Sequence, residues 1–253
     1  QMCIRDRGTH RIRRKTLNRN QIPEMNLVAD ALEYAKSLVA VPSVSRDSNA
    51  AVSDVVEKHL VDLGFQVERQ EFLDPYGVPK VNVIGKKGSG SGGLAYFSHT
   101  DVVPADTWTA PEGPFSPTVR DGRLYGRGSC DMKGSLACIL AAAARIRDTT
   151  LTSPLYIVCT ADEEVGFHGA RRVVDASRLY REMVAGQSRA IIGEPTELNV
   201  VYAHKGIYGF RVISRGKAAH SSTRHGLNAN MAMIPFLMEM KRTHDETLID
   251  PAW

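Results

Sequence analysis

Three segments of the chain repeat apolar residues at the three-to-four-residue spacing of an amphipathic helix. Residues 28–39 are followed by Pro42 and residues 50–63 by Gly64, and both residue types commonly end helices. We therefore predict one helix over each range. A third helix is predicted from residue 132 to about residue 147, with an apolar side formed by Leu136, Ile139, Leu140, Ala143 and Ile146.

Short apolar runs between these segments predict strands. Residues 65–71 and 81–85 form two of them, and the glycine-rich stretch 85–93 then predicts a hairpin or flexible loop. A phosphate-binding loop is disfavoured because these glycines lead into an apolar strand and not into a helix. Three continuously apolar runs, typical of buried strands in a mostly parallel sheet, follow at residues 94–98, 155–159 and 189–192. The predicted fold class is α/β, with helices flanking this sheet.

The pattern changes after Gly206. Residues 207–214 alternate between apolar and polar, which predicts a half-exposed strand, and a helix is predicted from about residue 228 to 243. This region is expected to begin a smaller α+β domain that is incomplete at Trp253. The predicted organisation is a tail (1–24), the N-terminal part of a catalytic domain (25–204), and the start of a second domain (205–253).

Charge is concentrated at the N-terminus. Residues 1–24 carry seven Arg or Lys against two acidic residues, a net +5, whereas the whole chain is +4, so the remainder sums to −1. A basic tail can contact nucleic acid, but this tail has neither interleaved aromatic residues nor an apolar period. A disordered extension, or sequence foreign to the fold, is favoured, and no nucleic-acid partner is predicted.

Other features favour a cytoplasmic protein that is not embedded in a membrane. No apolar run approaches the roughly 18 residues that span a bilayer, and no signal-peptide core is present in the sequence. None of the four cysteines forms a CxxC pair, so neither a zinc knuckle nor a disulfide framework is indicated. We expect reduced and mostly buried thiols.

Each of the three continuously apolar runs is followed by side chains that can bind metal. They are His99 and Asp101 after the first run, Glu163 and Glu164 after the second, and Glu194 after the third. Ligands gather at the carboxyl ends of parallel strands, so these side chains are expected to meet. Asp131 joins the set at the start of the third predicted helix, where its alternative role is to cap that helix.

Oxygen ligands with few histidines and no cysteine suit zinc, manganese or cobalt in a catalytic site. Asp131, at a rigid helix start, is expected to bridge two metals, and His99 to bind one of them. Asp101 lies two residues further along and is expected to accept the other imidazole N–H. Because adjacent side chains of extended chain point apart, we assign Glu164 as a ligand and Glu163 as the general base that activates a bridging water.

These motifs resemble the co-catalytic zinc family that contains acetylornithine deacetylase, succinyl-diaminopimelate desuccinylase, aminoacylases and a carboxypeptidase. The resemblance extends over residues 26–253 and is strongest towards acetylornithine deacetylase. It implies a zinc-exopeptidase-like catalytic domain with an inserted lid and dimerisation domain. The stretches that carry it are SHTDVVP (98–104), DGRLYGRGSCDMKGS (121–135), TADEEVGFHGA (160–170), IIGEPTE (191–197), AHKG (203–206) and GKAAHSS (216–222).

Carried over residue by residue, the resemblance implies two zinc ions per complete subunit, with Co²⁺ or Mn²⁺ as substitutes. His99, Asp131 and Glu194 would surround one zinc, and Asp131 and Glu164 the other. Asp101 would support His99, and Glu163 would be the base. The lid would form a homodimer and contribute two residues: His220, which would stabilise the oxyanion in the partner subunit's site, and Asn228, which would contact substrate.

One departure from the family's pattern concerns the second zinc. Its final histidine ligand lies near the family's C-terminus, and neither His225 nor His244 matches it. The resemblance therefore implies a truncated chain. The expected function is hydrolysis of the amide bond of N-acyl amino acids, most closely a deacetylase. The alternatives are a desuccinylase, a di- or carboxypeptidase acting on short peptides, or an inactive fragment that keeps the fold but not the second metal site.

Overall fold

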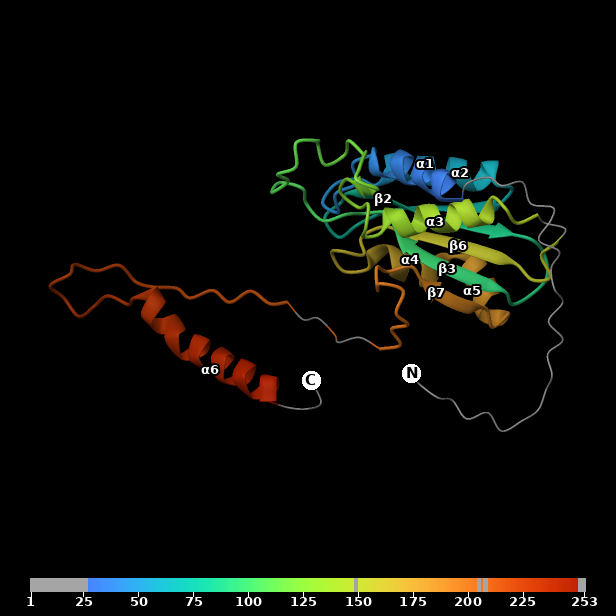
Figure 1. The fold of residues 1–253 in the computed structure, drawn as a ribbon. Helices are drawn as coiled ribbons and strands as arrows, with labels where there is room; N and C mark the ends of the chain where they lie inside the picture. Colours follow the sequence, from blue (N-terminus) through green and yellow to red (C-terminus); the bar gives the residue numbers. More distant parts are fainter. Residues whose placement is uncertain (1–26, 148–149, 204–205, 207–208, 250–253) are drawn as a thin grey trace. The chain divides into compact units, whose positions relative to one another are not determined.

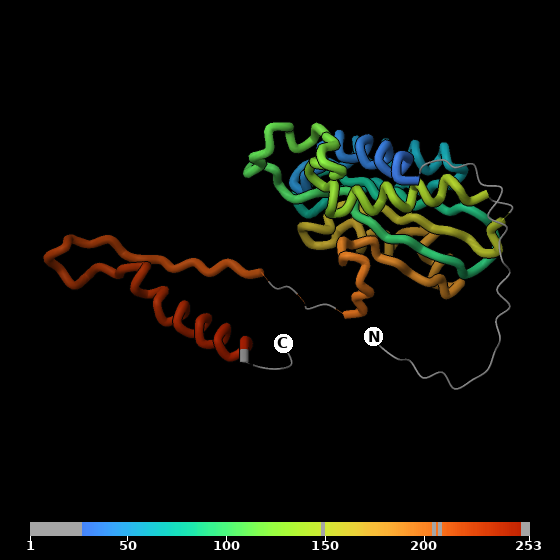
Figure 2. Tube along the Cα trace, viewed as in Figure 1, coloured from blue at the N-terminus to red at the C-terminus, as the bar shows by residue number. Residues whose placement is uncertain are grey.

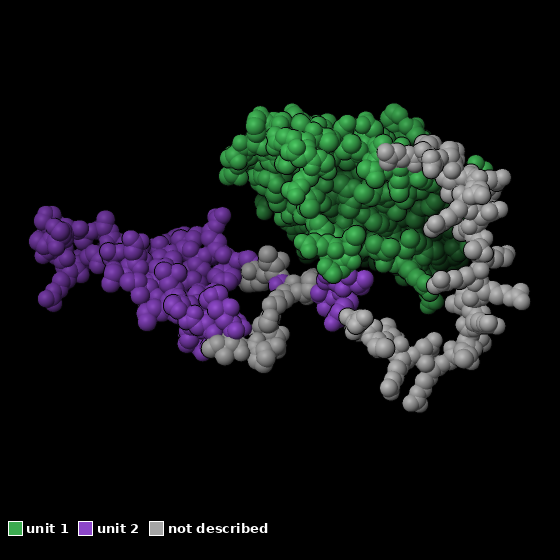
Figure 3. All heavy atoms as spheres, in the orientation of Figure 1, with its two compact units in different colours: residues 1–199 green, residues 200–253 purple. Residues whose placement is uncertain are grey.

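The computed structural model describes residues 27–147, 150–203, 206 and 209–249 (Figure 1). The predicted tail, residues 1–24, lies outside the described residues. The chain divides into two compact units, residues 1–199 and 200–253 (Figure 3). Their assignment as a catalytic domain and a lid stays a prediction. No helix in the described ranges is both long and apolar enough to cross a bilayer.

A five-stranded sheet forms the centre of the first unit. Its strand order is β1-β2-β6-β3-β7, and β6, β3 and β7 run parallel to one another. β1 and β2 are antiparallel, and β2 is antiparallel to β6, so the sheet is mixed and its parallel part is confined to three strands. The strands span Gln66–Leu73 (β1), Pro79–Lys87 (β2), Leu94–His99 (β3), Leu155–Thr160 (β6) and Arg189–Ile192 (β7).

Helices cover both faces of this sheet (Figure 1), which confirms the predicted α/β class. One face packs against α1 (Leu27–Val39), α2 (Ala50–Asp62) and α3 (Lys133–Ala143), and the other against α4 (His168–Ala176) and α5 (Arg178–Ala185). Every residue of β6 is buried because neighbours in sequence point into opposite cores. This two-sided burial explains the continuous apolar run that predicted the strand.

The predicted helices at 28–39 and 50–63 and the five strands predicted between residues 65 and 192 are confirmed within a few residues. The helix predicted to reach residue 147 ends earlier, at Ala143. Its last bonds, Arg145 N–H to Ala142 O and Ile146 N–H to Ala143 O, span three residues, so the final turn tightens and the helix stops. The glycine-rich stretch is a loop that begins after Lys87. Of the described cysteines, Cys159 is buried, but Cys130 and Cys138 are exposed, so the expectation of mostly buried thiols is wrong.

The sequence did not reveal a small hairpin in the long segment between β3 and α3. This hairpin pairs β4 (Thr118–Arg120) with β5 (Arg123–Tyr125), and Figure 2 traces the segment in green. The individual helices α4 and α5 were not predicted either. They have only nine and eight residues, which is shorter than the stretch over which a helical apolar spacing can be recognised.

The second unit contains α6 (Ala229–Ile249), which confirms the helix predicted from residue 228. The strand predicted over residues 207–214 is wrong for residues 209–214, which adopt no regular structure; residues 207 and 208 lie outside the described ranges. An alternating pattern forms a strand only where a neighbour takes its hydrogen bonds. Among the described residues of this unit, the only ladder contact is an isolated bridge between Lys217 and Leu227.

Candidate metal centre

The three parallel strands bring the predicted site residues of the first unit together. His99 is the last residue of β3 and pairs with Thr160 at the end of β6, while Phe97 pairs with Ile192 at the end of β7. Since parallel strands end at the same edge of a sheet, the residues that follow them meet there. Glu163, Glu164 and Glu194 therefore lie beside His99, as the sequence predicted.

The imidazole of His99 is buried at 2% exposure and faces acidic groups from both ring nitrogens. Nδ1 lies 2.9 Å from the backbone oxygen of Asp101 and 3.5 Å from its Oδ1. Nε2 lies 3.2 Å from Asp131 Oδ1, 3.9 Å from Glu194 Oε1 and 4.0 Å from Glu163 Oε2. Burial lowers the pKa of His99, but the hydrogen bond to Asp101 and the surrounding negative charges outweigh it and raise this pKa to about 9.

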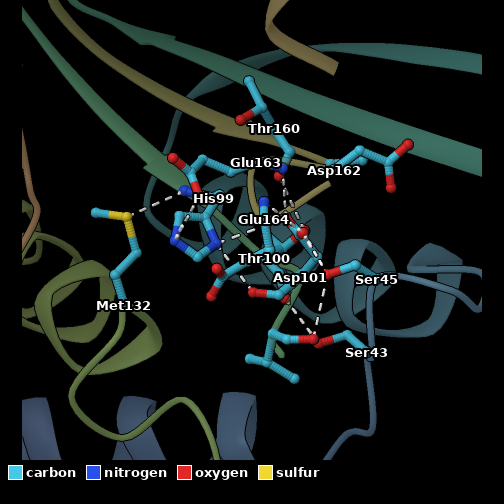
Figure 4. A network of polar contacts seen from close by, with 12 residues as sticks. Ser43, Ser45, His99, Thr100, Asp101, Met132, Thr160, Asp162, Glu163 and Glu164 are labelled. Atoms are coloured by element: carbon cyan, nitrogen blue, oxygen red, sulfur yellow. Dashed lines mark hydrogen bonds and ion pairs between the residues drawn. The ribbon is translucent and has the colours of Figure 1, made fainter. Parts of the chain in front are cut away.

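Asp101 is buried behind His99 and accepts several hydrogen bonds there (Figure 4). Its Oδ2 accepts from Ser45 Oγ at 2.7 Å and from the backbone N–H of Glu164 at 3.3 Å, and its Oδ1 accepts from the backbone N–H of Glu163 at 3.1 Å. Burial raises the pKa of Asp101, but hydrogen bonds from His99 and Ser45 outweigh it, so the net pKa is lowered. An ionised Asp101 thus orients both His99 and the Glu163–Glu164 backbone.

Four carboxylates converge on the Nε2 side of His99: those of Asp131, Glu163, Glu164 and Glu194. Ligand atoms of His99, Asp131 and Glu164 all lie within 4.8 Å of one another. Burial is the largest cause that raises the pKa of Glu163, Glu164 and Glu194, and negative neighbours raise it further. A divalent cation would relieve this repulsion, and carboxylate and imidazole donors suit such an ion, so the residues fit a metal centre.

Asp131 does not cap α3, so the alternative role for this residue is wrong. The N-cap position belongs to Met132, and no side chain makes a capping hydrogen bond there. Met132 is itself buried, and its sulfur accepts a hydrogen bond from the His99 backbone N–H at 3.3 Å. The Asp131 side chain is half exposed and is directed to His99 Nε2, where a ligand is needed.

His220 and Asn228 belong to the second unit. His220 is exposed, and its Nδ1 lies 2.7 Å from Ser222 Oγ. Asn228 Oδ1 accepts hydrogen bonds from the backbone N–H groups of Asn230 and Met231, so this side chain caps the start of α6. The predicted roles of His220 with the oxyanion and of Asn228 with substrate stay predictions.

Sequence reasoning missed the residues that support the site from behind. Ser45 and Met132 bond to Asp101 and His99, and buried Lys80 lies beside Asp162, the residue directly before Glu163. Lys80 carries no local signal, because a lysine within a strand usually faces solvent. Ser45 carries no distinctive signal either, because serines are common in the turns that follow a helix.

A mixed α/β sheet that presents one histidine and several carboxylates at the ends of its parallel strands defines a metallohydrolase type of catalytic domain. Residues 95–243 match peptidase family M20/M25/M40. The match extends over more than half of the chain, and the chain belongs to this family.

Curated relatives carry the name acetylornithine deacetylase. The protein of Myxococcus xanthus is 44% identical over 190 residues, which cover 73% of this chain and 47% of the relative. The protein of Proteus mirabilis is 38% identical over 226 residues, covering 87% and 55%. The chain therefore spans about half the length of the curated relatives it matches.

Two solved structures show the same fold at low identity. Human carnosine dipeptidase 1 matches with a TM-score of 0.57 and 23% identity, over 66% of this chain and 39% of that protein. A metallo-carboxypeptidase of family M20 from Sulfolobus solfataricus matches with a TM-score of 0.52 and 21% identity, over 67% of this chain and 37% of its own. These likenesses confirm the α/β architecture around the candidate metal centre.

Proposed function

We propose that this chain provides the metal-binding and base-bearing part of a hydrolase that removes the acyl group from N-acyl amino acids. The observation that carries the proposal is the convergence of His99, Asp131, Glu164 and Glu194, with Glu163 beside them, at the ends of β3, β6 and β7. Relatives 36–44% identical are named acetylornithine deacetylase, which supports an N-acetyl amino acid as substrate.

The metal in this proposal is zinc, two ions per complete subunit, with Co²⁺ or Mn²⁺ as substitutes. His99, Asp131 and Glu194 would hold one ion, and Asp131 and Glu164 would contribute to the other. A bound cation of this kind polarises the scissile carbonyl and lowers the pKa of water. Asp131, whose carboxylate is half exposed, would be shared by the two sites.

Glu163 is the proton carrier. Burial and the neighbouring carboxylates raise its pKa, which makes it a better proton acceptor than an ordinary glutamate. The Glu163 carboxylate takes a proton from the attacking water and delivers it to the leaving amine. Asp101 fixes the backbone of Glu163, and His220 of the lid donates to the oxyanion, in a homodimer from the other subunit.

Substituting Glu163 tests the mechanism. With Zn²⁺ or Co²⁺ added, Glu163→Gln should lower the kcat for N-acetylornithine by about 10²–10⁴-fold, since general base catalysis contributes that much. Bound metal should stay unchanged, because the ligands remain. Glu71→Gln, at an exposed position of β1, is the matched control. Full activity of Glu163→Gln would refute the base assignment.

The acyl group is tested by comparing substrates. N-acetylornithine, N-succinyl-diaminopimelate and the dipeptide carnosine represent the deacetylase, desuccinylase and dipeptidase alternatives. The proposal expects the highest kcat/KM for N-acetylornithine. A higher kcat/KM for N-succinyl-diaminopimelate would favour the desuccinylase alternative, and a higher kcat/KM for carnosine would favour the dipeptidase alternative.

A second candidate is a metal-binding fold without activity. Among the described residues, one group of potential ligands lies within a common 4.8 Å, that of His99, Asp131 and Glu164. Calorimetric titration with Zn²⁺ separates the two candidates. Two tight sites support the active hydrolase, whereas one site or none supports the second candidate. The homodimer and the cytoplasmic location stay predictions.

A further inference from the structure

Lys80 is a buried lysine behind the candidate metal centre. It lies at the start of β2, and its side chain is 1% exposed. Its ammonium group donates to the backbone oxygens of Ser45 at 2.6 Å and Asp47 at 2.8 Å. Nζ also lies 2.8 Å from Asp162 Oδ1 and 3.7 Å from Asp74 Oδ2, so it is a cation between two buried acids.

The two segments that Lys80 joins are those that surround Asp101. On one side, Ser45 donates through its hydroxyl to Asp101 Oδ2 at 2.7 Å. On the other side, Glu163 and Glu164 donate their backbone N–H groups to the same carboxylate. Lys80 therefore connects the Ser45 segment, which donates a hydrogen bond to Asp101, to the turn before Glu163 and Glu164, which also donate to Asp101.

The Asp162 turn needs such a support. Asp162 adopts a left-handed backbone conformation with φ of 59°, which a residue other than glycine rarely adopts. Its carboxylate is fully buried, and its oxygens accept no hydrogen bond from any other described residue. Removing the ammonium would leave this charge without compensation, and the turn could then relax towards water.

We propose that Lys80 is a positioning residue that fixes Glu163 and Glu164 for the metal centre, by joining the Ser45 segment to the Asp162 turn. The contacts of Lys80 with other described residues include none of the candidate metal ligands, and it acts only through these two segments. The link to catalysis rests on the function proposed above, whereas the link to the turn is independent of it.

The test uses the whole chain and two readouts. The first is amide hydrogen exchange of Glu163 and Glu164, measured without metal. The second is the affinity for Co²⁺. Lys80→Met should speed exchange at these two amides at least about tenfold and weaken Co²⁺ binding about 10–100-fold, the usual effect of losing a residue that orients metal ligands.

Lys87→Met is the matched control. Lys87 is also a buried lysine of β2, but its Nζ donates to Leu63 O at 2.7 Å, at the other end of the strand. Its loss should leave both readouts unchanged. If Lys80→Met does not fold, Lys80→Met combined with Asp162→Asn removes both charges of the pair and serves in its place.

Each outcome is decisive. Faster exchange and weaker Co²⁺ binding in the Lys80 variant but not in Lys87→Met would support the role of Lys80. Unchanged amide exchange in a folded variant would overturn it, and so would Co²⁺ binding as tight as that of the wild type. If the wild type binds no Co²⁺, the proposed function fails, and the exchange data alone decide whether Lys80 holds the turn.

Discussion

Asp131 interacts with each of the other three candidate ligands, His99, Glu164 and Glu194. Its Oδ1 lies 3.2 Å from His99 Nε2, and its charge contributes to the raised pKa of Glu164 and of Glu194. It is also the carboxylate proposed to serve both metal ions. Its loss should therefore affect the whole centre and not a single coordination bond.

Asp131→Asn should weaken Co²⁺ binding by more than about 100-fold, because losing a ligand exceeds the 10–100-fold effect of losing a residue that only orients one. Isothermal titration calorimetry measures this change. Asp121→Asn, an exposed residue of the β4–β5 turn, is the control and should bind Co²⁺ like the wild type. Tight binding by Asp131→Asn would remove this residue from the ligand set.

The sequence was informative about residues whose position along the chain sets their place in space. His99, Glu163, Glu164 and Glu194 could be predicted because each lies at or just after the end of a strand, and strand ends converge. Lys80 and Ser45 could not, because their partners lie on other elements and include backbone oxygens that no side chain identifies. Contacts of this kind exist only after the elements have packed.

Helices were predictable where they were long, and not where they were short. α1 and α2 have 13 residues each, enough for several helical repeats, whereas α4 and α5 have nine and eight. β6 was predictable because its burial on both faces leaves a continuous apolar run. Residues 209–214 have the opposite problem, because their alternation is clear but no described strand pairs with them. Whether such a segment forms a strand thus depends on a pairing partner elsewhere in the fold, which a local sequence pattern does not reveal.

The packing of α2 against α1 makes the free energy of unfolding depend on pH. His59 of α2 lies 2.9 Å from Ser37 Oγ and edge-on to the Tyr34 ring. Burial lowers the pKa of His59 from 6.5; Lys58 lowers it further, and Asp62 opposes both. The unfolded chain therefore binds a proton at His59 more readily than the folded chain does.

The stability that neutral His59 contributes is complete above pH 6.5 and is lost as the pH falls through the lower, folded pKa. Urea unfolding across this range should show a larger fall in the free energy of unfolding for the wild type than for His59→Gln, which keeps a polar group near Ser37. Equal falls in both proteins would show that His59 does not contribute.

At the scale of the whole molecule, the two units differ in the extent to which they bury apolar side chains. The first unit buries its apolar residues in two cores, one on each face of the sheet. In the second unit α6 exposes most of its apolar residues, among them Met231, Ile234 and Met238. These three recur at helical spacing, so they form one apolar stripe.

The predicted homodimer should use this stripe. Replacing Met231, Ile234 and Met238 together by glutamine should shift the chain towards monomer in sedimentation velocity over a concentration series. The control replaces Thr243, His244 and Thr247, exposed residues on the opposite side of the same helix, by glutamine and should associate like the wild type. Equal association of both variants would place the dimer contact elsewhere.

β7 has a practical consequence for work with this chain. It pairs with β3 along one side, and no described residue pairs with its other side. Its side chains Ile191 and Ile192 are exposed. An open strand edge with apolar side chains is a template for adding another strand, from a second molecule if none is supplied from within. The substitution Ile191→Lys would place a charge on this strand and disfavour the pairing of another strand with it. The open edge of β7 therefore favours self-association of the chain as its concentration rises.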